Sequence, residues 1–207
     1  MPGFSFLSTL LAGLGAWSRR RTSRRGLVIG FLIGAVVVWL GVASDLSVLT
    51  VVGLFGTSVT VGSLLGQSLS PRSRPVLLAL IVLAGVDLAW IASGGGGAGE
   101  GWVKDVANFT IELGGSSSSI GTLDLVIAAA LAAHWLTRGA APWLAVAPGP
   151  VGMVFSNVFV ALTGATNLAL IPFLLLGWLI TEGLERRLHT AERSTDPTRS
   201  PGDADSG

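Results

Sequence analysis

The sequence predicts an all-helical fold, a polytopic membrane bundle of about six transmembrane helices. The composition, the lengths of the apolar runs and the placement of the arginines each indicate it. Half of the 207 residues are hydrophobic and 12% are charged, and the mean hydropathy is +0.70. These values exclude an ordinary soluble domain and a mainly disordered chain. Because the chain has no cysteine and only two histidines, far apart, we expect no disulfide and no metal centre.

Six apolar runs approach the length of about 20 residues that a helix needs to cross a bilayer. They cover roughly residues 26–43, 47–68, 75–93, 120–137, 142–163 and 166–182. Glycines stand four residues apart at Gly30 and Gly34 and at Gly62 and Gly66. This spacing allows close helix packing, although 29 glycines also produce it by chance. We therefore expect a six-span membrane domain over residues 26–182.

The positive charges predict the orientation of these helices. Of the thirteen lysines and arginines, only Lys104 falls on one side of the predicted bundle. The other side receives Arg19, Arg20, Arg21, Arg24, Arg25, Arg72, Arg74, Arg138, Arg186, Arg187, Arg193 and Arg199. Since positive residues gather on the cytoplasmic side, we expect both termini in the cytoplasm and the long loop 94–119 outside it.

Three segments lie outside the predicted spans. Residues 1–25 place an apolar run before an arginine cluster, the reverse of a signal peptide, so we expect an interfacial helix with an arginine anchor. In loop 94–119, the stretch GWVKDVANFTIEL indicates a short strand or hairpin. Residues 183–207 are predicted to be a cytoplasmic disordered tail, because the end of the chain is polar and rich in Pro and Gly. Nothing in the sequence indicates a cofactor or a nucleic acid partner.

Two acidic residues, Asp87 and Asp124, lie within the apolar runs. A carboxylate in a bilayer costs roughly 2.5 to 3.5 kcal/mol on insertion scales, and such residues usually face the bundle interior and serve a function. Asp87 stands about six residues before the end of its run and Asp124 about four after the start of the next. Both therefore lie roughly 6 to 9 Å inside the same membrane boundary. Consecutive antiparallel helices tend to be neighbours, so we expect the two carboxylates to face each other.

Two close carboxylates in an apolar site share one proton near neutral pH. Such a pair can hydrolyse an amide, because one member removes a proton from water while the other protonates the carbonyl oxygen. The titration belongs to the pair, so the sequence leaves open which aspartate holds the proton. Intramembrane aspartates also bind cations, relay protons or pair with helix ends.

The residues around the two aspartates add a more specific signal. Asp87 stands in Val86-Asp87-Leu88-Ala89-Trp90, and Asp124 in Gly121-Thr122-Leu123-Asp124. In order and spacing they resemble the YD motif, often YDxFW, and the GxGD motif of the presenilin and signal peptide peptidase family of intramembrane aspartyl proteases. The first motif lacks its tyrosine, and Leu123 replaces the second glycine of the other.

The third motif of that family, PAL with a following proline, falls on Ala169-Leu170-Ile171-Pro172, where only the last proline matches. The stretches Val106-Ala107 and Thr110-Ile111-Glu112-Leu113 look like a distant version of the segment between the catalytic motifs. The resemblance covers about residues 26–182. It implies Asp87 and Asp124 as catalytic residues, and contacts with the substrate from Gly121, Leu123, Ala169, Leu170, Ile171 and Pro172.

The resemblance implies hydrolysis of peptide bonds within transmembrane helices. With the orientation given by the arginines, it implies substrates whose N terminus is cytoplasmic, such as spent signal peptides or type II anchors. Two alternatives stay open: a catalytically inactive homologue, because the glycine and the tyrosine are missing, and a small transporter that couples ions or protons through the carboxylates. A transporter often shows inverted repeats, and the sequence shows none.

Overall fold

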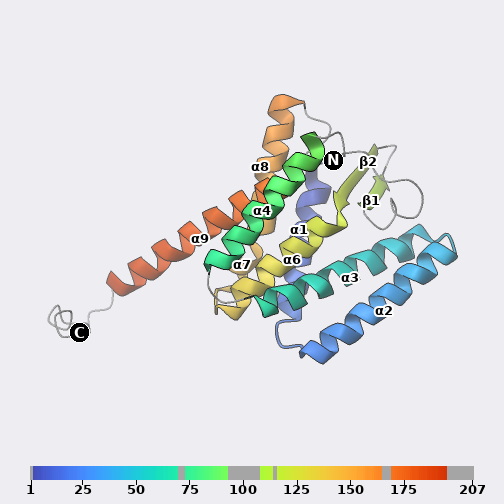
Figure 1. The fold of residues 1–207 in the computed structure, drawn as a ribbon, viewed down its shortest axis with the longest axis horizontal. Helices are drawn as coiled ribbons and strands as arrows, with labels where there is room; N and C mark the ends of the chain where they lie inside the picture. The colour runs from blue at the N-terminus through green and yellow to red at the C-terminus, as the bar shows by residue number, and fades with distance from the viewer. Residues whose placement is uncertain (1, 70–72, 93–107, 114–115, 165–168, 195–207) are drawn as a thin grey trace.

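The computed structural model of the protein describes residues 2–69, 73–92, 108–113, 116–164 and 169–194 (Figure 1). Apart from one two-stranded hairpin, the elements in this part of the chain are helices. In chain order they are α1 (Pro2–Ser18), α2 (Arg24–Ala43), α3 (Ser47–Ser68), α4 (Ser73–Ala92), β1 (Asn108–Leu113), β2 (Ser116–Gly121), α6 (Thr122–Thr137), α7 (Pro142–Val146), α8 (Pro148–Thr163) and α9 (Ile171–Ser194).

Each of the six predicted apolar runs contains a helix. Two of these helices, α2 and α3, are long and apolar enough to cross a membrane. The fifth run is divided at Ala147 into α7 and α8, since Pro148 and Pro150 lack the N–H groups that would continue the hydrogen-bond ladder. The amide of Ala147 instead bonds to the nearer carbonyl of Leu144.

Helix α6 lies at the centre of the bundle. It packs against α1, α3, α7, α8 and α9, and residues 127–135 are all buried. Five of those residues are alanines, whose small side chains let neighbouring helices approach closely. On α3, a Cβ atom at Gly62 would collide with the carbonyl oxygen of Val126, and one at Gly66 with that of Ala130. The predicted close contact at these two glycines is confirmed.

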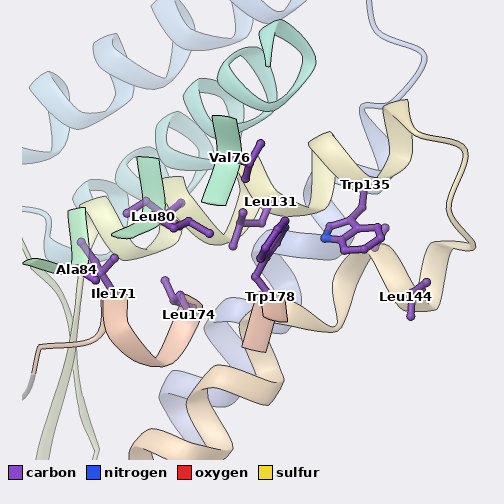
Figure 2. Packing of buried hydrophobic residues seen from close by; sticks show 11 residues of the cluster. Val76, Leu80, Ala84, Leu131, Trp135, Leu144, Ile171, Leu174 and Trp178 are labelled. Carbon is purple, nitrogen blue, oxygen red and sulfur yellow. The ribbon is translucent and has the colours of Figure 1, made fainter. Parts of the chain in front are cut away.

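An apolar cluster joins α4 and α9 to α6 and α7 (Figure 2). It consists of Val76, Leu80, Ala84, Ile127, Leu131, Trp135, Leu144, Ala145, Ile171, Leu174 and Trp178. The rings of Trp135 and Trp178 are tilted with their centroids 6.5 Å apart, a favourable geometry for an aromatic pair. The cluster brings α4 and α6 to the same helix, α9.

Helix α1 packs with one face against α3, α6, α7 and α8, while Leu7, Leu11 and Leu14 are exposed. The interfacial position expected for residues 1–25 stays a prediction. Ala12 and Ala16 are buried in a second apolar cluster with residues of α3, α6 and α8, and Gly13 lies against Val146. The small residues of α1 face the neighbouring helices. The mean hydropathy of the segment does not show which face of the helix will be buried. The first turns of α1 lie beside β2, whereas α9 extends away from the bundle toward the C terminus (Figure 1).

Helix α9 continues for twelve residues beyond the predicted boundary at 182, so residues 183–194 are helical rather than part of a disordered tail. Arg138, just after α6, contacts the first of these additional turns. Its guanidinium bonds to Glu182 at 2.8 Å and to Glu185 at 2.9 Å, and both glutamates are buried. Glu182 and Glu185, which follow the apolar run in the sequence, therefore hold this part of α9 near the end of α6. Residues 195–207 lie outside the described part of the chain.

The strands β1 and β2 form an antiparallel hairpin with Thr110 opposite Ser119. The hairpin lies in the loop where the sequence indicates a strand or hairpin. Lys104 and the Val106-Ala107 match lie outside the described residues. Because β2 ends at Gly121 and α6 begins at Thr122, the hairpin leads directly to the start of the central helix.

Replacing Gly62 by alanine is expected to destabilise the bundle by about 1 to 3 kcal/mol, because the added methyl group forces α3 away from α6. Thermal unfolding of the purified protein in detergent measures this. Gly56 on the same helix is the matched control, since a Cβ atom there meets nothing within 4 Å. Gly56→Ala should leave the stability unchanged or raise it, since alanine is the better helix former. Equal effects of the two substitutions would contradict the α3–α6 contact.

Replacing Arg138 by methionine is expected to lower the free energy of unfolding by about 3 to 5 kcal/mol, because it leaves the buried Glu185 without its ion-pair partner. Arg186 also pairs with Glu182, but its side chain is 73% exposed. Arg186→Met should therefore change the stability by less than about 1 kcal/mol. The same unfolding measurement compares the two variants.

Candidate active site

Asp87 lies on α4, one and a half turns before the helix ends. Its Oδ2 atom accepts a hydrogen bond from the backbone N–H of Ile171 at 3.1 Å. Ile171 is the first residue of α9, and the N–H groups in the first turn of a helix have no partner within that helix. The carboxylate of Asp87 therefore caps α9 from a neighbouring helix.

Asp124 is the third residue of α6 and caps its own helix. Its carboxylate accepts a hydrogen bond from the backbone N–H of Gly121, the residue that precedes the helix, as the acidic residue of a capping box does. A Cβ atom at Gly121 would lie only 2.6 Å from Oδ2 of Asp124. The first glycine of the GxGD-like motif thus leaves room for the carboxylate.

The structure brings the two aspartates together. Asp87 lies close enough to Asp124 for its charge to act on the second carboxyl group. Both side chains are partly buried. Since Asp87 also bonds to Ile171, the three segments that the sequence analysis singled out meet at the hairpin end of the bundle. We refer to Asp87, Asp124 and the N–H of Ile171 as the aspartate site.

The other residues of the third motif surround the start of α9. Ala169 is 5% exposed and Ile171 3% exposed, and Leu170 packs against both apolar clusters. Pro172 is partly buried in the first turn of α9, where its missing N–H leaves no donor unsatisfied. These residues fix the position of the Ile171 amide and thereby of Asp87.

The two departures from the family motifs both lie on exposed surface. The side chain of Leu123 is 54% exposed and that of Val86 is 62% exposed. In a helix, neighbouring residues point about 100° apart, so a residue next to an inward-facing aspartate faces outward. Leu123 therefore does not fill the space between the aspartates.

The sequence analysis did not identify the hydrogen bond from Ile171. A backbone amide carries no residue signature, but Pro172 marks the start of a helix, and a helix start implies N–H groups in need of an acceptor. Among the described residues, no group of three or more His, Asp or Glu side chains could hold a metal ion. The chemistry that this arrangement offers is proton transfer between two carboxyl groups and a bound reactant.

Comparisons with models of known protein families, with curated proteins and with solved structures give no match.

Cross-linking tests the proximity of the two aspartates, because the chain contains no natural cysteine. A protein with Asp87→Cys and Asp124→Cys should be joined by a short bifunctional thiol reagent, detected by mass spectrometry of the digested protein. Asp87→Cys combined with Thr190→Cys is the control. Thr190 lies nineteen residues along α9 from Ile171, about 28 Å away, so that pair should stay unlinked. Equal yields for the two pairs would contradict the aspartate site.

Proposed function

We propose that the protein is an intramembrane aspartyl protease that hydrolyses peptide bonds in transmembrane helices, with Asp87 and Asp124 as the catalytic pair. One observation carries the proposal. Asp87 is hydrogen-bonded to the segment of the third motif, and it lies close enough to Asp124 for its charge to act there. These segments are far apart in the chain, and a protease of this class needs them in one place.

The proposed reaction uses the two carboxyl groups as general base and general acid. The ionised member removes a proton from a water molecule, whose oxygen attacks the carbonyl carbon of the substrate. The protonated member gives its proton to the carbonyl oxygen. When this gem-diol intermediate collapses, the C–N bond breaks as the member that took the proton from water gives it to the nitrogen. The other member takes a proton from a hydroxyl of the intermediate, so the pair again holds one proton. The reaction needs one carboxyl group protonated and the other ionised, and either aspartate can begin as the base.

The proposal includes a membrane placement, which rests on apolar surface and charge. Many large apolar side chains are exposed on α2, including Ile29, Leu32, Ile33, Val36 and Trp39, as expected for helices that face lipid. The arginines between α1 and α2 lie at the opposite end of α1 from the hairpin (Figure 1). We place the arginine end in the cytoplasm and the hairpin end outside it.

This placement changes one part of the expected topology. Because the first turns of α1 lie beside β2, we propose that α1 starts on the hairpin side, whereas the sequence analysis expected the N terminus in the cytoplasm. The C terminus stays cytoplasmic. Substrates would be single helices with a cytoplasmic N terminus, as the resemblance implies for this orientation.

Cleavage of a reporter with such a helix, by purified protein in lipid, tests the proposal. Asp87→Asn and Asp124→Asn should each lower the rate by at least about 10² to 10⁴, because proton transfer in the transition state contributes that much. Asp45→Asn is the matched control. Asp45 is exposed and has a positive φ of 54°, a conformation that asparagine also adopts readily, so this variant should keep full activity.

A graded variant tests the geometry as well as the residue types. Gly121→Ala must displace the Asp124 carboxylate by about 1 Å to reach an ordinary contact, a misplacement that can reduce a rate roughly 100-fold. If folded wild-type protein cleaves none of several reporters, or if both asparagine variants stay active, the protein is not a protease that works through this pair.

A further inference from the structure

An apolar groove of about 580 Å³ runs between α1 and the α7–α8 pair. We call it the α1–α8 groove. Its lining includes Leu10, Leu14, Trp17, Trp143, Val151 and Val154. The volume is within the range of about 300 to 1,000 Å³ that is typical of small-molecule sites. The lining side chains offer apolar contact rather than a set of hydrogen bonds, so the groove fits a hydrocarbon chain.

The length of the groove matches one leaflet of a bilayer. On α1 the lining begins at Phe6 and ends at Trp17, eleven residues or about 16 Å. Half of a hydrocarbon core of about 30 Å is 15 Å. Trp17 and Trp143 line the arginine end of the groove, and indole rings favour the level of the lipid headgroups.

Positive charge adjoins the tryptophan end. The guanidinium of Arg20 lies 4.9 Å from the centroid of the Trp17 ring, and Arg20, Arg21, Arg24 and Arg25 are exposed. Within the described part of the chain, the arginines that form ion pairs are Arg138 and Arg186 rather than any of these four. Arg19 differs, because its guanidinium donates to Thr60 on α3 at 2.7 Å.

We propose that the α1–α8 groove binds one acyl chain of an anionic phospholipid, whose phosphate group lies against Arg20 and Arg21. The apolar groove and the adjoining arginines complement the two halves of such a lipid. Clusters of basic residues at the cytoplasmic end of a membrane helix bind anionic headgroups, and here the cluster continues into a site for the chain. The inference rests on the membrane placement proposed above but not on proteolysis.

Native mass spectrometry of the full chain tests this site. The protein is purified in detergent with equal amounts of phosphatidylglycerol and phosphatidylcholine, and the retained lipids are counted. Wild type should retain one phosphatidylglycerol molecule with at least a tenfold preference. Arg20→Gln with Arg21→Gln should lower that preference at least fivefold, since each arginine contributes about that factor. The matched control, Arg74→Gln with Arg187→Gln, removes two exposed arginines away from the groove and should change nothing.

A second pair of variants tests the groove itself. Val151→Trp fills it and should remove the retained lipid, whereas Val82→Trp, at a 64% exposed position on α4, should not. Val154→Trp repeats the test nearer the other end of the groove if Val151→Trp does not fold. Equal retention of the two lipids by wild type overturns the proposal. So does lipid retention that survives a folded groove-filling variant, because it places the lipid on the arginine surface alone. Neither readout involves reporter cleavage, so a failed protease assay leaves this result standing.

Discussion

The close approach of other helices to α6 is the constraint on which the rest of the structure depends. The alanines between residues 127 and 135 keep the helix narrow, and Gly62 and Gly66 let the backbone of α3 reach its carbonyl groups. In a bilayer, lipid tails are as apolar as leucine, so tight packing rather than transfer from water holds helices together. A larger residue at these contacts would separate α3 from α6 and disturb the helix that carries Asp124.

Polar contacts supplement this packing at two points along α9. At the start of the helix, Asp87 accepts the hydrogen bond of Ile171. The second polar contact begins at Glu182, eleven residues or about 16 Å further along the helix. There Arg138 joins Glu182 and Glu185, and its guanidinium also lies 4.5 Å from the Trp135 ring centroid. Buried ion pairs add little net stability, but breaking one is costly. These contacts therefore contribute more to the position of α9 relative to its neighbours than to the net stability of the bundle.

The sequence predicts the helices well because each apolar run is long and bounded by glycine, proline or charge. It also indicates the pairing of Asp87 with Asp124, since depth can be counted from the ends of the runs. Two features escape it. The packing of α1 depends on which face its small residues occupy relative to partners distant in the chain. The extension of α9 depends on Arg138, since Glu182 and Glu185 resemble a helix end until their partner is known.

The hydrogen bond between Asp87 and Ile171 opposes sliding of α4 along α9. Helices that meet mainly through apolar side chains can slide past one another, because such contacts are replaced by similar ones after a small shift. Each residue of sliding moves a helix by about 1.5 Å, and a bond of 3.1 Å stretched by that amount is broken. Sliding of α4 along α9 by even one residue would therefore leave a carboxylate and an amide unpaired. The hydrogen bond thus adds to the apolar cluster a contact that is lost when α4 shifts along α9.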